Sequence, residues 1–390
     1  MIAAAAFWRT QLPAELRFLL DVMAASFRPV ILHAPFGIDW GRFLDAVGHH
    51  RVVPLMGPAL AADGPVPEAV RVQLLELQRQ ATRRMLALGG ELVGVATAFQ
   101  AAGIELVVLK GPALSELLYG DPWRRFSRDI DLMVRPEAEA AALDLLCTLG
   151  YGENGQLIAR NTNAVSLYHQ RFSFPLELHV RFGDDDRLLP CRLVRPFENV
   201  ARVSIGGQHI PTLGPEAAVV YAAYHGTNHV WSLLYWLADM AAFQRSGVVD
   251  WPAALDLARR AGVERQLALA MVLVEDLIGV SLPAVLAREA ALIGRARRAA
   301  RPLRAVIAGT GDGDDRAAFH RFGGLRYVVW DALMYRRPAA RWAALANRAQ
   351  PSERDRGWLR LPDWLGFLYY GVRLARVIGG ACSGIVGRRR

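Results

Sequence analysis

Cysteine and long apolar runs are scarce in this chain of 390 residues. Its three cysteines, Cys147, Cys191 and Cys382, stand far apart and form neither a metal-ligand spacing nor a disulfide framework, which predicts a reducing, cytoplasmic environment. No uncharged apolar run of about 18 residues occurs, so we expect no membrane-spanning segment. The N-terminal MIAAAAFWRT lacks a positively charged leader, so we expect no signal peptide.

Lysine is scarcer still, because Lys110 is the only lysine among 46 basic residues and the others are arginines. In a chain so rich in arginine, a lone lysine indicates either a site that needs a compact ammonium group or chance survival. The formal charge of +9 is spread along the whole chain. Such a balance favours attraction to nucleotides, RNA or acidic lipid without choosing among them.

The hydrophobic periodicity divides the chain into three regions. Helical spacing predicts a helical N-terminal region over 1–90, including one long helix or a helix pair over 67–102. Strands and helices then alternate irregularly over 91–213, and residues 214–390 are almost wholly helical in pattern. We therefore predict an α+β fold with a small mixed sheet between N-terminal and larger C-terminal helical regions. The predicted strands cover 104–110, 129–134, 164–170, 174–182 and a hairpin turned at Gly206-Gly207.

Three carboxylates are the first candidate site. Asp129 and Asp131 are two residues apart in a predicted strand, so their side chains leave the same face. Glu177, His179 and Arg181 share one face of a second strand. Either these faces are solvated, or Glu177 joins the aspartates in a centre for Mg²⁺ or Mn²⁺, both of which prefer oxygen ligands.

A turn rich in phosphate-binding features precedes these carboxylates. Lys110-Gly111 joins a predicted strand to a helix, where backbone N–H groups and the lysine could meet an anion. The spacing is not that of a P-loop. Arg125 and Ser127 follow in the next loop as second-tier phosphate contacts, although any one arginine is more often a surface residue.

The order of these motifs resembles the nucleotidyltransferase superfamily, whose fold is shared with polymerase β, and most of all its uncharacterised bacterial "nucleotidyltransferase family protein" group. The resemblance covers most of the chain. Lys-Gly replaces the usual Gly-Ser turn, as is normal in that group, and Glu177 stands where aspartate is commoner. The matching positions are Leu109-Lys110-Gly111, Ala113-Leu114, Tyr119, Asp121-Pro122, Arg125, Asp129-Ile130-Asp131-Leu132, Gly150-Tyr151, His169, Glu177-Leu178-His179, His225-Gly226, His229, Trp231, Trp236-Leu237 and Asp239.

The resemblance implies an enzyme in which Asp129 and Asp131 hold two metal ions and Glu177 holds the catalytic ion and helps to deprotonate the nucleophile. The residues expected to contact the nucleotide are Lys110, Gly111, Arg125, Ser127, His179 and His229. A nucleoside triphosphate such as ATP would give up its NMP to a hydroxyl or phosphate. The acceptor would be a ribosomal peptide natural product, in keeping with natural-product biosynthesis, or a small metabolite.

Other functions stay open beside this one. A catalytically silent nucleotide-binding scaffold would have no use for paired carboxylates, and a toxin-like enzyme that modifies tRNA fits the basic balance, though nucleic acid is not the favoured partner. His225 and His229 have zinc-compatible spacing without an evident third ligand, so we expect structural histidines or a wall of the acceptor cleft. Trp231 and Trp236 are expected in the core. The C-terminal segment from Gly366 is expected to pack as a helix, with weak peripheral membrane contact as the alternative.

Overall fold

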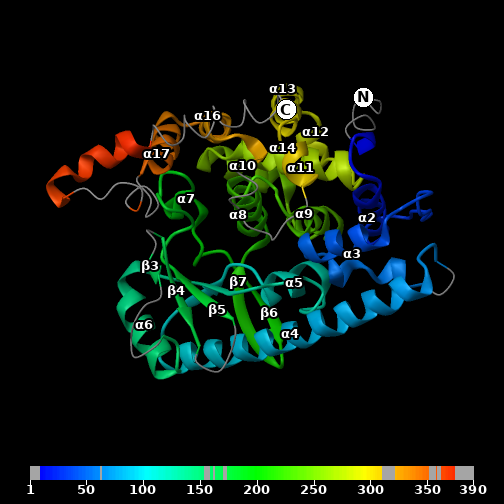
Figure 1. The fold of residues 1–390 in the computed structure, drawn as a ribbon. Coiled ribbons are helices and arrows are strands. Elements are labelled where there is room, and N and C mark those ends of the chain that lie inside the picture. The colour runs from blue at the N-terminus through cyan, green and yellow to red at the C-terminus, as the bar shows by residue number, and fades with distance from the viewer. Residues whose placement is uncertain are drawn as a thin grey trace.

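The computed structural model describes residues 9–61, 64–152, 159–160, 163–169, 174–309, 321–350, 357 and 362–373. These residues form an α+β fold in which one mixed sheet lies between helices (Figure 1). Most of the apolar, basic C-terminal segment lies outside the described residues, so its predicted packing is not tested.

The sheet has seven strands in the order β3-β4-β5-β2-β1-β7-β6. Strand β1 pairs in parallel with β7, and β2 with β5, while the other neighbours are antiparallel. The predicted Gly-Gly hairpin is confirmed, because Gly206 and Gly207 turn the chain with φ of +58° and +81°, a conformation that favours glycine. The bounds are β1 Leu106–Val108, β2 Ile130–Val134, β3 Ala159–Arg160, β4 Ala164–Tyr168, β5 Pro175–His179, β6 Val200–Ile205 and β7 Gln208–Leu213.

Alternation along the central strands gives the sheet two buried faces. The long helix α4 (Glu68–Ala101), a single helix of 34 residues, packs Leu92 and Phe99 against Val108 and Leu132. Helix α6 (Glu139–Thr148) contributes to the same core; in Figure 1, α4 runs below the sheet and α6 lies to the left of β4. The predicted boundary between residues 90 and 91 falls inside α4, which continues through it as one helix. The division of the chain into domains stays a prediction.

The opposite face belongs to a second core, shared with the N- and C-terminal helices. Val107, Leu109 and Met133 point this way, toward α5 (Pro112–Tyr119) and α8 (Pro215–Asn228). Side chains of odd-numbered residues in β2 and β5 therefore face the helical part of the molecule. The remaining α-helices are α2 Ala14–Ala25, α3 Trp40–His49, α7 Cys191–Val194, α9 Leu234–Ser246, α10 Trp251–Ala261, α11 Glu264–Leu277, α12 Ala284–Ala287, α13 Ala290–Ala300, α14 Leu303–Ile307, α16 Gly324–Met334 and α17 Pro338–Ala349.

None of the described helices combines the length and the apolar character that a bilayer crossing requires.

Candidate active site

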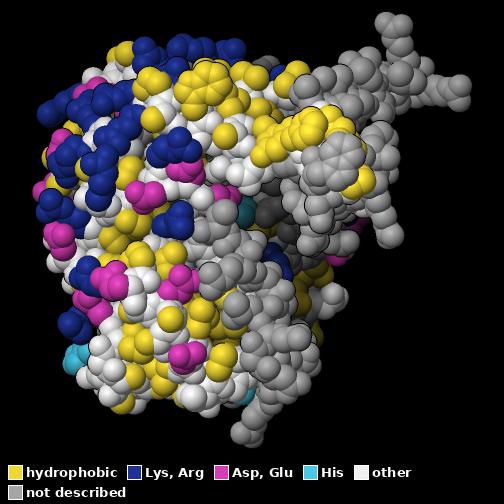
Figure 2. Space-filling model, turned by 90° about the vertical axis from the view of Figure 1, so that its left-hand side faces the viewer, with side chains coloured by type: hydrophobic (Ala, Val, Ile, Leu, Met, Phe, Trp, Pro, Cys, Tyr) yellow, Lys and Arg dark blue, Asp and Glu magenta, His cyan; other side chains and the backbone are white. Residues whose placement is uncertain are grey.

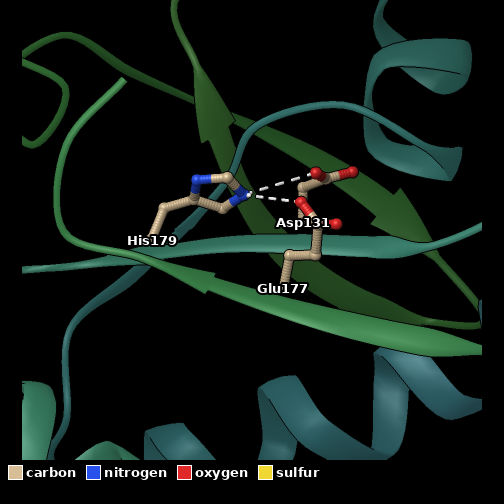
Figure 3. Close-up of side chains that lie close together, drawn as sticks. All are labelled: Asp131, Glu177 and His179. Carbon is tan, nitrogen blue, oxygen red and sulfur yellow. Dashed lines mark ion pairs between the residues drawn. The ribbon is translucent and has the colours of Figure 1, made fainter. Parts of the chain in front are cut away.

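Parallel pairing of β2 with β5 brings two acidic residues together. Asp131 is the register partner of Glu177, and His179 follows two residues later on the same face. The imidazole of His179 points at both carboxylates (Figure 3), with its Nε2 3.5 Å from Asp131 Oδ1 and 3.4 Å from Glu177 Oε2. One potential ligand atom from each of the three residues lies within 4.8 Å of the others. The pairing of the two strands thus brings Asp131 into one cluster with Glu177 and His179, which lie 46 and 48 residues further along the chain.

Lys110, two residues after the end of β1, lies beside the carboxylate of Asp131. The backbone N–H of Leu109 donates to the carbonyl of Asp131, which fixes the end of β1 beside the middle of β2. The Lys110 Nζ then lies 3.1 Å from Asp131 Oδ1. Burial opposes a charge on this lysine, but Asp131 and Asp129 outweigh it and raise the pKa of Lys110 well above its usual value. The only lysine is therefore a charged, largely buried partner of the central aspartate.

Gly111 gives the chain a sharp change of direction directly after the lysine. Its φ of +75° favours glycine, and a Cβ there would lie 3.5 Å from Ser127 Oγ and 4.0 Å from the carbonyl oxygen of Asp129. The Lys110–Gly111 turn and the 127–129 segment are thus packed against each other. Ser127, buried beside this turn, accepts a hydrogen bond from Arg125 Nη1 at 2.9 Å.

Asp129 lies differently from the prediction. It belongs to the bend before β2, which begins at Ile130, because the chain is still passing around the Gly111 turn at this point. Burial and the negative charge of Asp131 raise the pKa of Asp129. The positive charges of Lys110, Arg125 and Arg128 lower it, but by less. Asp129 therefore borders the cluster electrostatically, whereas the ligand atoms that converge come from Asp131, Glu177 and His179.

The chemistry of this donor set fits a divalent cation. Neither Asp131 oxygen accepts a well-formed hydrogen bond from the described residues, and neither ring nitrogen of His179 has such a partner. Buried polar atoms without partners are costly, and a cation would satisfy the Asp131 oxygens and one of these nitrogens. Without a cation, burial opposes a proton on His179, but Asp131 and Glu177 prevail and raise the pKa of His179 to about 8. The neighbouring His179 in turn lowers the pKa of Glu177, whose side chain is 34% exposed.

Arg125 forms an ion pair with Asp239 and does not face the Asp131 cluster with a free guanidinium group. Its Nε lies 3.0 and 2.9 Å from the two oxygens of Asp239 on α9, and both side chains are 4% exposed. Burial opposes charge on both groups, yet Asp239 keeps the pKa of Arg125 above its usual value. This placement does not support the expectation that Arg125 contacts phosphate directly, because its guanidinium is already bound to a carboxylate and to Ser127.

The two histidines after β7 line a wall rather than a metal site. His225 and His229 lie with ring centroids 4.6 Å apart and both contact the ring of Trp236. Burial, Lys110 and His229 lower the pKa of His225 well below its usual value, so its ring is neutral. Within the described residues, the cluster able to hold a metal is the one around Asp131, and these histidines are not part of it. Trp231 and Trp236 are buried, as predicted.

Sequence reasoning missed two arginines that approach the site from the N-terminal region. Arg84 donates from Nη2 to the carbonyl of Arg128 at 3.1 Å, and Arg51 lies over the ring of Tyr235. Burial is the main cause that lowers the pKa of both Arg51 and Arg84. The positive charge of Arg128 lowers both pKa values further, and the negative charge of Asp129 raises them. Three cations thus gather around one carboxylate. Only the tertiary fold could reveal this group, because its members are far apart in the sequence.

A cavity of about 300 Å³ extends from the cluster into the helical part of the molecule. Lys110, Asp131, Glu177 and His179 line one end of the cavity. The remaining lining comes mainly from α8, the segment after β5, α16 and α17, and includes His225 and His229. Figure 2 shows a hollow on the face that carries α17, with a histidine side chain visible in its depth. The convergent polar side chains and the cavity together are the ordinary features of an active site.

Comparisons with known proteins bear on this site. No curated protein matches the chain. A solved structure of the antibiotic-resistance factor ANT(2'')-Ia is similar to it at 16% identity and a TM-score of 0.28, covering 56% of this chain and 98% of the other. That similarity is too low to show a shared fold. The family model described as "Uncharacterised nucleotidyltransferase" matches residues 37–279, more than half of the chain, and spans the whole Asp131 cluster. The chain therefore belongs to this family of nucleotidyltransferases and is a transferase.

Proposed function

We propose that this nucleotidyltransferase moves an NMP unit from a metal-bound nucleoside triphosphate to a hydroxyl group of an acceptor, with Asp131 at the centre of the reaction. The observation that carries the proposal is the convergence of Asp131, Glu177 and His179 beside Lys110, with buried Asp131 oxygens that accept no well-formed hydrogen bond from the described residues. A silent scaffold would gain nothing from such a cluster, because buried charges without full pairing destabilise a fold.

The triphosphate fits on the Lys110 side of Asp131. Lys110 offers one ammonium group, and Gly111 allows the backbone to approach a phosphate closely. Arg51, Arg84 and Arg128 repel one another around Asp129, and a polyanion would relieve that repulsion. Arg125 and Ser127 then position the turn from behind, since their polar atoms are already paired with Asp239 and with each other.

Asp131, Glu177 and His179 would hold the divalent cation, with Asp129 close enough to adjust the charge around it. When bound, Mg²⁺ or Mn²⁺ neutralises the negative charge that develops at phosphorus during in-line displacement. The imidazole nitrogen in this set favours Mn²⁺ over Mg²⁺, because Mg²⁺ prefers oxygen ligands throughout.

The acceptor approaches from the cavity, where the Glu177 carboxylate is the most exposed member of the cluster. The acceptor oxygen forms a bond to the α-phosphorus, and the bond from that phosphorus to the bridging oxygen of the β-phosphate breaks. Glu177 takes the hydroxyl proton and later releases it to water, while pyrophosphate leaves with the electron pair. Lys110 offsets the charge on the departing phosphates. Small metabolites and peptide side chains both carry hydroxyl groups that could serve as acceptors.

Calorimetry tests the first half of this proposal. Wild-type protein should bind one or more of the four ribonucleoside triphosphates in Mn²⁺ or Mg²⁺ and lose that binding when EDTA is added. Asp131→Asn should weaken metal-dependent binding, whereas Asp276→Asn, which alters a carboxylate paired with Arg297 outside the cavity, should not. Equally tight binding in EDTA by wild type and Asp131→Asn would show that this cluster is not the nucleotide site.

A further inference from the structure

The cavity continues beyond the catalytic cluster to a second group of buried polar atoms. Asp331 on α16 is 2% exposed, and its Oδ2 lies 3.1 Å from Arg348 Nε on α17. The other carboxylate oxygen, Oδ1, has no hydrogen-bond partner among the described residues, and neither has Asn347 Nδ2. All three residues line the same cavity as Glu177. The far end therefore presents an unused acceptor and an unused donor next to a paired charge, and the buried hydroxyl of Tyr224 on the same lining also has no hydrogen-bond partner among the described residues.

The burial of Asp331 is not explained by the stability of the fold. A buried carboxylate oxygen without a hydrogen-bond donor destabilises a protein, and an apolar residue at this position of α16 would avoid that cost. Asp331 is also the only acidic residue between Asp315 and Glu353, a stretch rich in arginine. The unused atoms of Asp331 and Asn347 are what a bound ligand would satisfy.

Aromatic side chains form the walls between the two polar ends. Tyr221 and Tyr224 on α8 and Tyr335 after α16 line the cavity, and all three are at least nine-tenths buried. The hydroxyl of Tyr335 donates to Asn228 Oδ1 at 3.4 Å, which leaves its ring as a wall. Such rings cover the C–H surface of a ligand whose edges carry polar groups.

The charge of the far end selects among ligand classes. Arg348 pairs with Asp331, and Asp184 is a further carboxylate on the cavity lining, so the described residues at this end offer no surplus of basic groups that would attract a phosphate tail. A hydroxyl group can donate to Asp331 Oδ1 and also accept from Asn347 Nδ2. A volume of about 300 Å³ lies at the small end of ligand pockets, which suits a compact molecule better than a peptide segment.

We propose that the acceptor is a compact, polyhydroxylated molecule, such as a sugar or a cyclitol, held by Asp331 and Asn347. Another of its hydroxyl groups then faces Glu177 at the catalytic end of the cavity. This assignment rests on the nucleotidyl transfer proposed above and names its acceptor class.

The test uses full-length protein with Mn²⁺ and the four ribonucleoside triphosphates labelled at the α-phosphate. The acceptor panel contains glucose, sucrose, myo-inositol and a serine- and threonine-containing peptide, and products are identified by mass spectrometry. We expect an NMP ester of a polyol and none of the peptide. If calorimetry shows metal-dependent nucleotide binding while the peptide alone is labelled, or no panel member is labelled, the acceptor assignment is overturned and the nucleotide site stands. If nucleotide binding itself is missing, both proposals fail.

Variants at the far end then locate the acceptor. Asp331→Asn and Asn347→Leu should each raise the KM for the polyol by about tenfold or more, because each leaves a bound hydroxyl without its partner. Asp276→Asn is the matched control, since it alters another interhelical Asp–Arg pair, with Arg297 at 2.8 Å, outside the cavity. Melting temperatures identify variants that fail to fold, and Asn347→Leu keeps the test decisive if Asp331→Asn does. An unchanged KM in a folded variant would overturn the assignment.

Discussion

Two buried ion pairs border one small space near α8, and they are built in opposite ways. In the first, Arg125 meets both oxygens of Asp239 at 2.9 and 3.0 Å and also donates to Ser127. In the second, Lys110 lies 3.1 Å from one oxygen of Asp131, whose carboxylate accepts no well-formed hydrogen bond in the described part of the chain. Lys110, Arg125, His225 and Asp239 line the space between them.

The difference separates a structural pair from a ligand site. In the first pair the Nε of Arg125 reaches both carboxylate oxygens and its Nη1 donates to Ser127, so the pair can stabilise the junction of the 120–129 loop with α9 without any ligand. An aspartate with unused oxygens beside a second carboxylate and an imidazole is incomplete, and a cation would complete it. Both pairs contain a basic residue and an aspartate that the sequence singled out, but only the second keeps coordination capacity free.

Asp131→Asn should give the largest effect on activity. Removing the charge at the centre of the cluster should lower turnover by about 10³ or more, since it weakens cation binding and transition-state stabilisation together. Single-turnover transfer from an α-labelled triphosphate measures this, with the melting temperature as the check on folding. Near-normal turnover in the asparagine variant would remove the distinction between the two pairs.

Asp239→Asn should show the reverse pattern. It leaves the Arg125 guanidinium buried without its carboxylate and should cost about 3–5 kcal/mol of unfolding free energy. Urea unfolding measures that loss, and the molecules that stay folded should retain most of their metal-dependent nucleotide affinity. The double variant Arg125→Met/Asp239→Leu should recover much of the stability, because neither charge is then left unpaired. A stable but inactive Asp239→Asn would instead place Arg125 in the chemistry.

Lys110→Arg should be nearly as damaging as Lys110→Ala. A guanidinium fork is wider than an ammonium group, and the lysine is 13% exposed beside Asp131, so the larger head has little room. The loss of this charge-assisted contact should lower turnover by about 10²–10³. Steady-state kinetics on the two variants would check this, and an arginine variant with full activity would mean that the lone lysine is an accident of codon drift.

His50 provides the smallest and most independent test, because it is buried and forms no ion pair with any residue that the structure describes. Its Nδ1 accepts from the backbone N–H of Leu234 at 3.4 Å, and burial, His49 and Arg321 lower the pKa of His50 to about 3. Above pH 6.5 the ring is neutral in both states and stability is at its full value. As the pH falls from about 6.5 toward 3, His50 takes up a proton in the unfolded chain but stays neutral in the folded chain. The free energy of unfolding should therefore fall by about 1.4 kcal/mol per pH unit.

His50→Asn keeps an acceptor for Leu234 and should reduce this acid sensitivity, while His33→Asn, at an exposed position, should not. Urea unfolding between pH 7 and 5 compares the three proteins. Equal slopes in wild type and His50→Asn would show that the loss of stability in acid comes from other groups.

Much of the fold could be predicted from the sequence because its signals are local. The strand-like runs at Leu106–Val108, Ile130–Val134 and Pro175–His179, the Gly206-Gly207 turn and the helical pattern after Pro215 depend on periodicity and turn residues within short windows. The family could be recognised for the same reason, since its motifs keep a fixed order along the chain. Strand β3 was not foreseen, whereas the single helix α4 is one of the two alternatives predicted for residues 67–102.

The sequence by itself determined the residue types available to the candidate site: a lone lysine before a glycine, alternating carboxylates in and beside strands, and histidines on one face. The tertiary structure decided how they combine. Strand register places His179 beside Asp131 and Glu177 and leaves Asp129 in the preceding bend. Helix packing commits Arg125 to Asp239 and places Asp331 in the same cavity as Glu177. Local patterns fix which way a side chain leaves its own strand or helix, but a partner more than a hundred residues away is chosen only when burial makes each unpaired polar atom costly.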